Sequence, residues 1–459
     1  MLPRFAGLCA GSWLSAVLAV LVAPAASGPS THQLSGDVDA MAESFMRTHH
    51  APGMALCVIQ HGKILVSRGY GIADLENAVP VSRDSEFAMA SITKQLTAAG
   101  ILHLAEKRML DLDDGISRFV PDLPDYYRGV TIRRLLNHTA GVRNLQDLGD
   151  RYWGQSHGHI EPKGLIDLFR REPLNFEPGT DYHYSNSGYV LLGAAIEKTG
   201  GEPYGDYVRH HLLDRLGIKH MIYPGSLALL EHRVRPYWYN GKALVNAAYF
   251  DPSAGFAMGG CYSTAEDLAL WTEALHHGRV LSPYYYQLMI TPETLLDGEP
   301  LSYGYGMELG SIEDHTLYAH AGGGVGFISQ ALYVPDEDLT IAVMSNSNFD
   351  GGAVEMADRV LHRILHVGGP LDLPLAAGEA ERYAGRYCMD DERVEIVLVN
   401  GHLLFRDSSG SRRLLYQGNG AFAQEGRVAR LHFREKDGQV DGFALARYGS
   451  LLDRAVREN

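Results

Sequence analysis

Residues 91–106 restrict the fold of this chain more than any other segment. The segment opens with Ser-Ile-Thr-Lys, and the helix that it predicts carries apolar side chains almost all round. The apolar positions are Leu96, Ala98, Ala99, Ile101, Leu102, Leu104 and Ala105. Because a helix without a polar face has to be covered on every side, it lies in the middle of a domain. We therefore expect other elements to surround residues 91–106.

Strand patterns precede and follow this helix. Residues 54–59 and 63–71 are apolar runs on either side of His61-Gly62, which predicts a hairpin. Helical segments broken by turns fill residues 111–275. Three more strands and a helix are indicated at residues 316–320, 326–334, 339–345 and 353–365. This order predicts a mixed α/β (α+β) fold, in which an antiparallel sheet flanked by helices carries an inserted helical subdomain and joins both ends of the segment.

The chain changes character after residues 368–377, where glycines and prolines indicate a linker. Short alternating strands follow at residues 393–399, 402–406, 412–416, 428–434 and 440–447. Asn400-Gly401 between two of these runs is a strong hairpin signal. We expect a main domain over residues 27–367 and a small antiparallel β-barrel or sandwich domain over residues 378–459.

Residues 1–26 have the pattern of a signal peptide. Arg4 precedes an apolar stretch that ends at Val22, and small residues then offer a cleavage site for signal peptidase. The alternative is an uncleaved anchor, which glycines and serines within the apolar run disfavour. No later segment approaches transmembrane length. We therefore expect an exported protein, periplasmic or secreted, with no stable membrane span after cleavage of the signal.

Charge and cysteine content exclude several kinds of partner. The formal net charge is -15 without a run of lysines or arginines, so the chain would repel a phosphate backbone, and no nucleic acid is expected to bind. Beyond the signal, Cys57, Cys261 and Cys388 are odd in number and widely spaced, which fits neither a disulfide framework nor a metal site. We expect them to be small core residues.

Ser91 and Lys94 are the first candidates for chemistry. A spacing of three places both side chains on one helix face, where the amine can accept the proton of the hydroxyl. The lysine can do so only when its charge is suppressed, and burial in an apolar helix suppresses it. Taken alone the pattern is weak, because a serine helix cap followed by a solvated lysine gives the same letters.

Tyr184-Ser185-Asn186 is the second candidate. It follows a turn-rich stretch and precedes a helical pattern that includes Tyr189, which predicts a loop between helices. A tyrosine hydroxyl near a lysine can pass a proton to a leaving group, and an asparagine amide can hold a substrate carbonyl. The alternative is an aromatic anchor beside a turn asparagine.

The third candidate is the run from His320 through Ala321, Gly322 and Gly323 to Gly324, at the end of a predicted strand. Glycines there allow a substrate to lie against the strand edge, and a backbone N–H can face the reacting carbonyl. A phosphate-binding loop is the competing interpretation. It fails because the glycine pattern is incomplete and leads into another strand.

Residues 154–158 match the Gly-x-Ser-x-Gly sequence of α/β-hydrolases. That motif needs an apolar strand before it and a helix after it, and neither is present. We interpret the stretch as a polar loop that flanks the active-site cleft. His157 and His159 lack metal-ligand spacing, so solvated or structural roles are expected.

In this order and these settings, the three motifs resemble the class C β-lactamase and D-alanyl-D-alanine carboxypeptidase superfamily, which also contains D-aminopeptidases and carboxylesterases. The resemblance extends over residues 54–365. Further stretches typical of such proteins lie at residues 131–141, 184–189, 263–268 and 303–306. Residues 383–387 resemble the start of the small β-barrel modules that some relatives carry.

The resemblance implies a mechanism and a set of roles. Ser91 attacks an acyl carbonyl and forms an acyl-enzyme that water cleaves, while Lys94 and Tyr184 move the proton. Asn186 orients the substrate, and the backbone N–H groups of Ser91 and Gly323 form the oxyanion hole. The substrate is a small molecule or peptide, and neither a metal nor an organic cofactor is implied.

One departure bears on the substrate. Class C β-lactamases usually have Lys-Thr-Gly where this chain has His320-Ala321-Gly322, and a histidine is only partly charged near neutral pH. This favours D-amino-acid peptides or small esters and amides over β-lactams. A class C-like β-lactamase and a non-catalytic penicillin-binding sensor remain as alternatives. Gln146 is placed like a substrate-contacting glutamine of some β-lactamases, but we expect a surface loop residue.

Overall fold

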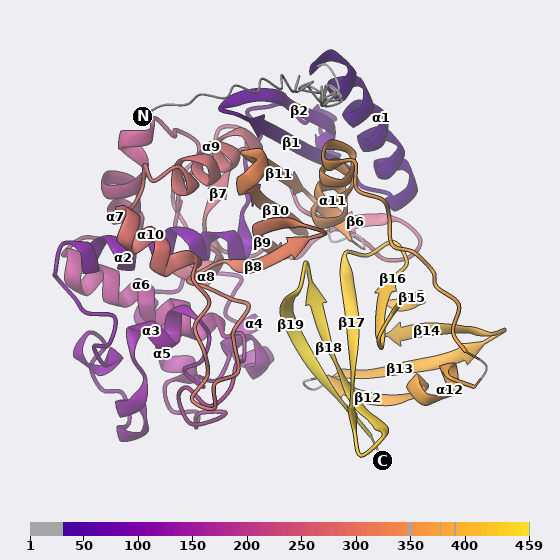
Figure 1. The fold of residues 1–459 in the computed structure, drawn as a ribbon. Helices are drawn as coiled ribbons and strands as arrows, with labels where there is room; N and C mark the ends of the chain where they lie inside the picture. Colours follow the sequence, from indigo (N-terminus) through magenta and orange to yellow (C-terminus); the bar gives the residue numbers. More distant parts are fainter. Residues whose placement is uncertain (1–30, 348–350, 377, 390–391, 459) are drawn as a thin grey trace, which may run out of the picture.

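The computed structural model describes residues 31–347, 351–376, 378–389 and 392–458. They form a seven-stranded antiparallel sheet with helices on both faces, a large helical part beside it, and a closed eight-stranded barrel at the C-terminal end (Figure 1). The predicted mixed fold with a small antiparallel barrel is confirmed. The predicted signal peptide, residues 1–26, lies outside the described residues. Within the described ranges, no helix is both long and apolar enough to cross a membrane.

The sheet joins the two ends of the main segment, as its sequence order predicts. The strand order is β3-β2-β1-β11-β10-β9-β8. The bounds are β1 Gly53–Gln60, β2 Lys63–Asp74, β3 Val79–Pro80, β8 Glu308–Ile312, β9 His315–Gly324, β10 Phe327–Val334 and β11 Leu339–Ser345. β1 pairs with β11 in the centre, with Met54 opposite Ser345. A strand from the start of the segment therefore completes the sheet with one from its end.

Side chains of β1 alternate between two cores. Met54, Leu56 and Val58 pack against α1 (Thr31–His49) and α11 (Gly352–Leu365). Cys57 and its neighbours two residues away point to the opposite face, toward the helical part. A strand buried on both faces is apolar at every position, because successive side chains point to opposite faces. The prediction that the cysteines are core residues is confirmed for Cys57 and Cys261, whose side chains are fully buried, and is wrong for Cys388, which is only partly buried.

The helical part surrounds α2, which spans Thr93–Glu106. Every residue of α2 except the last is buried, as its apolar sequence predicts. The helices around it are α3 Ile132–Leu136, α4 Asp150–Trp153, α5 Pro162–Phe169, α6 Asn186–Gly200, α7 Tyr204–Val208, α8 Pro252–Gly259, α9 Ala265–His276 and α10 Pro283–Ile290. Two short ladders complete this part, namely β4 (Phe87–Ala88) with β7 (Tyr262–Ser263), and β5 (Tyr237–Tyr239) with β6 (Leu244–Asn246).

The barrel follows residues 367–376, which form neither helix nor strand, and the short helix α12 (Ala380–Tyr383). Its strands are β12 Gly385–Met389, β13 Glu392–Val399, β14 His402–Asp407, β15 Gly410–Gly418, β16 Ala421–Gln424, β17 Ala429–Lys436, β18 Gln439–Arg447 and β19 Ser450–Arg457. Aromatic side chains such as Phe422 and Phe443 fill its interior. The division into domains at residues 367 and 377 stays a prediction.

The barrel contacts the main sheet through the β18–β19 hairpin, which lies beneath β8 in Figure 1. The Tyr448 carbonyl oxygen accepts a hydrogen bond from Ser311 N–H at 2.7 Å. A Cβ at Gly310 would lie 2.2 Å from the same oxygen, so only glycine fits this approach. Arg447 forms an ion pair with Glu308, with Nε 2.9 Å from Oε2, and both side chains are largely buried. The hairpin is thus held tightly against β8.

Candidate active site

Ser91 lies in a single 3-10 turn, Ala90–Ile92, immediately before α2. The sequence predicts that Ser91 opens the helix itself, and the structure places it in the turn that leads into the helix. Ala90 has a φ of 46°, a left-handed conformation that is uncommon for a residue with a Cβ. Such strain persists where the surrounding structure over-determines it, and it is frequent at functional sites.

Lys94 lies beneath Ser91, within the core. Its side chain is fully buried, and Nζ is 3.3 Å from Ser91 Oγ. Nζ also donates hydrogen bonds to Asn186 Oδ1 at 2.7 Å and to the Met258 carbonyl oxygen at 2.8 Å. Burial lowers the pKa of Lys94 well below its usual value, because an ammonium loses its hydration there. The predicted pairing of a serine with a charge-suppressed lysine is thus present in the geometry.

Tyr184 lies over this pair. Its ring centroid is 4.8 Å from Lys94 Nζ, and burial raises the pKa of its hydroxyl, an effect that a hydrogen bond with Ser91 partly opposes. The loop that carries it is fixed by His138, whose Nδ1 accepts a hydrogen bond from Ser185 N–H at 3.1 Å. The His138 ring also lies 4.2 Å from the Tyr184 ring, centroid to centroid. The structure therefore brings Ser91, Lys94 and Tyr184 together from two separate segments.

Asn186 connects Lys94 to a further loop. It is the first residue of α6, one step beyond the loop that the sequence predicts. Its Oδ1 faces Lys94, and its Nδ2 donates to Gln146 Oε1 at 2.9 Å. Its backbone N–H donates to Asn144 Oδ1 at 3.1 Å. The expectation that Gln146 is merely a surface loop residue is wrong, because Gln146 orients the amide that holds Lys94.

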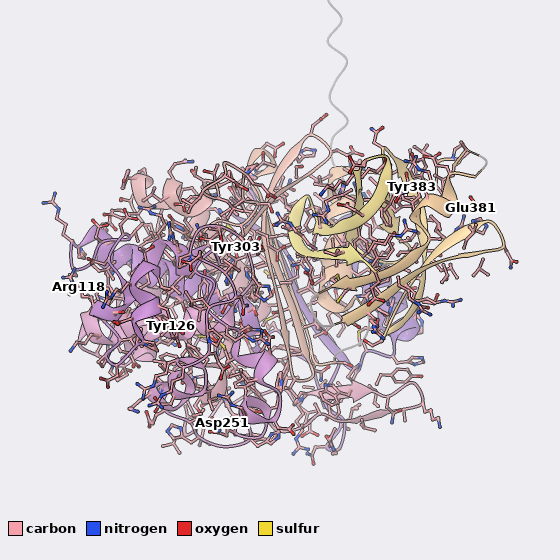
Figure 2. All side chains as sticks on the ribbon, turned by 90° about the horizontal axis from the view of Figure 1, so that it is seen from below. Arg118, Tyr126, Asp251, Tyr303, Glu381 and Tyr383 are labelled. Atoms are coloured by element: carbon pink, nitrogen blue, oxygen red, sulfur yellow. The ribbon has the colours of Figure 1, made fainter. Side chains whose placement is uncertain are left out.

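His320 lies behind the site and is 2% exposed. Its Nδ1 is 2.6 Å from the Ala321 carbonyl oxygen, so this nitrogen carries the proton. Its Nε2 then accepts a hydrogen bond from Tyr303 O–H at 2.8 Å. Burial lowers the pKa of His320 to about 4, with Glu308 opposing the shift. The expectation of partial charge near neutral pH is therefore wrong, since this imidazole is neutral there. Figure 2 shows Tyr303 on the helical side, close to the barrel.

The two candidate glycines of β9 differ in their surroundings. A Cβ at Gly322 would lie 2.1 Å from the Met89 carbonyl oxygen and 2.3 Å from Ser329 Oγ. Gly322 therefore lets β9 lie directly against the segment that leads to Ser91. A Cβ at Gly323 would meet no atom within 4 Å, and Gly323 is exposed at the cavity beside Ser91.

That cavity has a volume of about 610 Å³. Of the candidate residues, Ser91, Asn186, Gly323 and Gln146 line it, whereas Lys94, Tyr184, His320 and Gly322 do not. Its aromatic lining consists of Tyr152, Trp153, Trp238 and Phe250. Ser156 and His157 also line it, so the prediction that residues 154–158 flank the cleft is confirmed. A substrate bound at Ser91 can therefore pack against the apolar surface of this cavity.

His138, Asn144 and Tyr303 are site residues to which sequence reasoning gave no role. His138 and Tyr303 stand in two of the stretches typical of the superfamily, residues 131–141 and 303–306. Their place in these stretches was the available signal, but nothing in the local sequence shows which side chains His138 and Tyr303 contact.

The fold and the site define a serine hydrolase of the penicillin-recognising class. The chain belongs to the Beta-lactamase family, whose family model matches residues 38–365.

Individual known proteins are similar to this chain over most of its length. Penicillin-binding protein 4* of Bacillus subtilis (strain 168) is 28% identical over 401 residues, which cover 81% of this chain and 87% of that protein. The octameric penicillin-binding protein homologue from Pyrococcus abyssi has the same fold, with a TM-score of 0.65 and 23% identity over 92% of this chain and 99% of its own. D-amino acid amidase from Ochrobactrum anthropi SV3 has a TM-score of 0.63 and 25% identity, over 73% of this chain and 98% of its own.

Proposed function

We propose that this chain is an exported serine hydrolase that acts through an acyl-serine intermediate on D-amino-acid peptides or on small esters and amides. The observation that carries the proposal is the fully buried Lys94 amine, 3.3 Å from the Ser91 hydroxyl at the edge of an open cavity. A serine hydroxyl becomes an effective nucleophile when an adjacent base takes its proton. Lys94 is such a base.

The reaction proceeds in two halves. Neutral Lys94 takes the Ser91 proton as Oγ forms a bond to the acyl carbon of the substrate. The leaving group then departs with a proton that returns through Lys94 and Tyr184. In the second half, water gives a proton to the same groups as it attacks the acyl carbon, and these groups return the proton to Ser91 Oγ when its bond to the acyl carbon breaks. The backbone N–H groups of Ser91 and Gly323 stabilise the negative oxygen in both halves.

The substrate class rests on the neutral His320 and on the relatives. Where class C β-lactamases usually have a lysine, this chain has a buried, neutral imidazole that bonds Tyr303. The site therefore lacks the permanent cation that a lysine offers a β-lactam carboxylate. A relative named as an amidase of D-amino acids supports a D-configured amide or peptide. His320 acts here by positioning Tyr303. Asn186 lines the substrate cavity, and Gly322 lets β9 approach the segment that carries Ser91.

A direct test compares Ser91→Ala with Ser156→Ala, because both serines line the same cavity. The substrates are a nitrophenyl ester, a D-alanyl-D-alanine peptide and a chromogenic cephalosporin. We expect Ser91→Ala to lose at least about a thousandfold in kcat/KM, while Ser156→Ala still turns over and still forms the acyl adduct by mass spectrometry. Full activity of Ser91→Ala would exclude the mechanism, and a stable adduct without turnover would indicate a penicillin-binding sensor.

Export is tested separately. The full chain, expressed in a bacterium with a secretory pathway, is expected in the periplasm or medium, with its N-terminus near residue 27 by mass spectrometry. Retention of residues 1–26 in the cytoplasmic fraction would contradict cleavage and export.

A further inference from the structure

A second cavity adjoins the one beside Ser91. Its volume is about 520 Å³, within the usual range of small-molecule sites. The walls that both cavities share are formed by Ala90, Ala248, Phe250, Gly259, Gly324 and Val325. Since Ala90 directly precedes Ser91, a substrate whose carbonyl lies at Ser91 can extend into the second cavity. What this cavity offers such a substrate depends on its charged lining.

Arg233 is a charged residue of this cavity that forms no ion pair with a carboxylate of the described residues. Its guanidinium lies over the Tyr262 ring, 5.3 Å from the centroid, and donates a hydrogen bond to Tyr262 Oη at 3.3 Å. No ion pair of Arg233 with a carboxylate occurs among the residues that the structure describes. Arg235 lines the same cavity but forms an ion pair with Glu76, with Nη1 3.2 Å from Oε1. The two arginines therefore differ in whether a charge partner is already present.

The backbone fixes Arg233 relative to the nucleophile. Glu86 N–H donates to the His232 carbonyl oxygen at 2.9 Å, and Val234 N–H donates to the Glu86 carbonyl oxygen at 3.0 Å. Glu86 directly precedes β4, the strand that leads to Ser91. The segment that carries Arg233 is thus hydrogen-bonded to the segment that leads to Ser91. The Arg233 guanidinium is held in addition by the Tyr262 ring.

The carboxylate of this lining, Asp74, already has hydrogen-bond partners. Asp74 accepts two hydrogen bonds from Asn77, one from the backbone N–H at 3.0 Å and one from Nδ2 at 2.8 Å. Arg235 Nε lies 3.8 Å from the same carboxylate. The cavity therefore has one unmatched charge, and that charge is positive. A planar guanidinium binds a carboxylate through two parallel hydrogen bonds.

We propose that Arg233 binds a carboxylate of the substrate, so that the preferred substrates are anionic esters, amides or peptides whose carboxylate extends from the scissile carbonyl into the second cavity. This inference rests on the proposed function and adds its substrate class. The neutral His320 leaves recognition of an anion to another residue, and Arg233 supplies a cation in the adjoining cavity. It is a specificity residue, since it touches the substrate and not the reacting atoms.

Two esters that differ in one charge test the inference. The 4-nitrophenyl monoester of glutaric acid carries a free carboxylate, and its methyl ester is neutral. We expect kcat/KM of the anionic ester to fall about tenfold in Arg233→Gln, because a charge-assisted hydrogen-bonding partner is lost, while the neutral ester changes less than about twofold. Arg233→Lys should recover part of the loss. Arg128→Gln removes one positive charge outside both cavities and should leave the ratio of the two esters as in the wild type.

A binding measurement keeps the inference separate from turnover. Titration calorimetry of glutarate into Ser91→Ala, and into Ser91→Ala with Arg233→Gln, is expected to give about tenfold weaker binding in the second protein. Equal affinities, or an equal loss on both esters, would overturn the role of Arg233 and leave the hydrolase intact. A third outcome would contradict the proposed function alone. In that outcome Ser91→Ala hydrolyses the esters as fast as the wild type, while glutarate still binds more weakly when Arg233 is replaced by Gln.

Discussion

At the scale of single residues, the surroundings of Lys94 decide its protonation state. The three groups within hydrogen-bond distance of Nζ are all neutral, namely the Ser91 hydroxyl, the amide oxygen of Asn186 and the carbonyl oxygen of Met258. Neutral acceptors offset little of the hydration that an ammonium loses on burial, so the amine form is favoured. Among the residues that the structure describes, no carboxylate pairs with Nζ, and this arrangement favours an uncharged amine next to Ser91.

The pH dependence of the reaction follows from this arrangement. In the proposed mechanism Lys94 acts as an unprotonated base, so we expect kcat/KM to fall as the pH drops through its lowered pKa. Asn186→Asp places a carboxylate where the amide oxygen now lies 2.7 Å from Nζ. We expect it to raise the pKa of Lys94 and to move the acidic limb of the pH profile about 1–3 units toward higher pH.

Gln146→Glu is the matched control for that shift. It adds the same charge one residue further away, next to Asn186 Nδ2, so its shift should be smaller. Identical acidic limbs in the wild type and in Asn186→Asp would mean that Lys94 is not the group that titrates.

A second prediction at this scale concerns the two glycines of β9. Gly322→Ala forces a Cβ against the Met89 carbonyl oxygen, whereas Gly323→Ala meets no atom within 4 Å. We expect Gly322→Ala to lower the free energy of unfolding by about 1–3 kcal/mol and to displace the strand from Ser91. Gly323→Ala should change stability by less than about 1 kcal/mol. Urea unfolding of both variants measures the difference, and equal midpoints would contradict the close approach.

At the scale of elements, the sequence predicts what local patterns encode. β1, β2, β10, β11 and α11 lie close to their predicted ranges because apolar runs and turn residues mark them. The 3-10 turn at Ser91 was not predicted, because a single turn has too few residues to show a period. Neither were the contacts of His138, Gln146 and Tyr303, since each joins segments far apart in the sequence. Closure into a barrel rather than a sandwich likewise depends on strand pairing across the whole β region.

The contact between the barrel and β8 gives a prediction about elements. Removing only Arg447 leaves the Glu308 carboxylate buried without a partner, so Arg447→Ala should cost about 3–5 kcal/mol of stability. Replacing both residues, as in Arg447→Met with Glu308→Leu, should cost much less, because no charge is left uncompensated. Arg128→Ala breaks an exposed pair with Asp125 and serves as the control. Equal costs for Arg447→Ala and the double variant would contradict a buried, coupled pair.

At the scale of the whole molecule, buried histidines couple stability to pH. Burial lowers the pKa of His320 to about 4 and that of His276 to about 3. In the unfolded chain both imidazoles take up a proton below about 6.5. Because the unfolded state then binds more protons, the free energy of unfolding falls as the pH drops from about 6.5 toward 4. Each histidine contributes a slope of up to about 1.4 kcal/mol per pH unit in that window.

His276→Gln tests this coupling. His276 is stacked on Tyr333, with ring centroids 4.3 Å apart, and it lies on the same helix as the buried Trp271. Urea unfolding followed by tryptophan fluorescence at pH 5 and pH 6 should give a shallower pH slope in the variant, by up to about 1.4 kcal/mol per pH unit. An unchanged slope would mean that His276 is already protonated in the folded protein.

The pairing of β1 with β11 also sets the order in which the chain can fold during synthesis. Met54 finds its partner only when Ser345 has been made. At the usual rate of translation this takes on the order of tens of seconds, during which the apolar α2 has no complete cover. Contacts so distant in sequence also slow folding itself. Until Ser345 has been made, the growing chain cannot close its central sheet, and it stays in the open condition that chaperones bind.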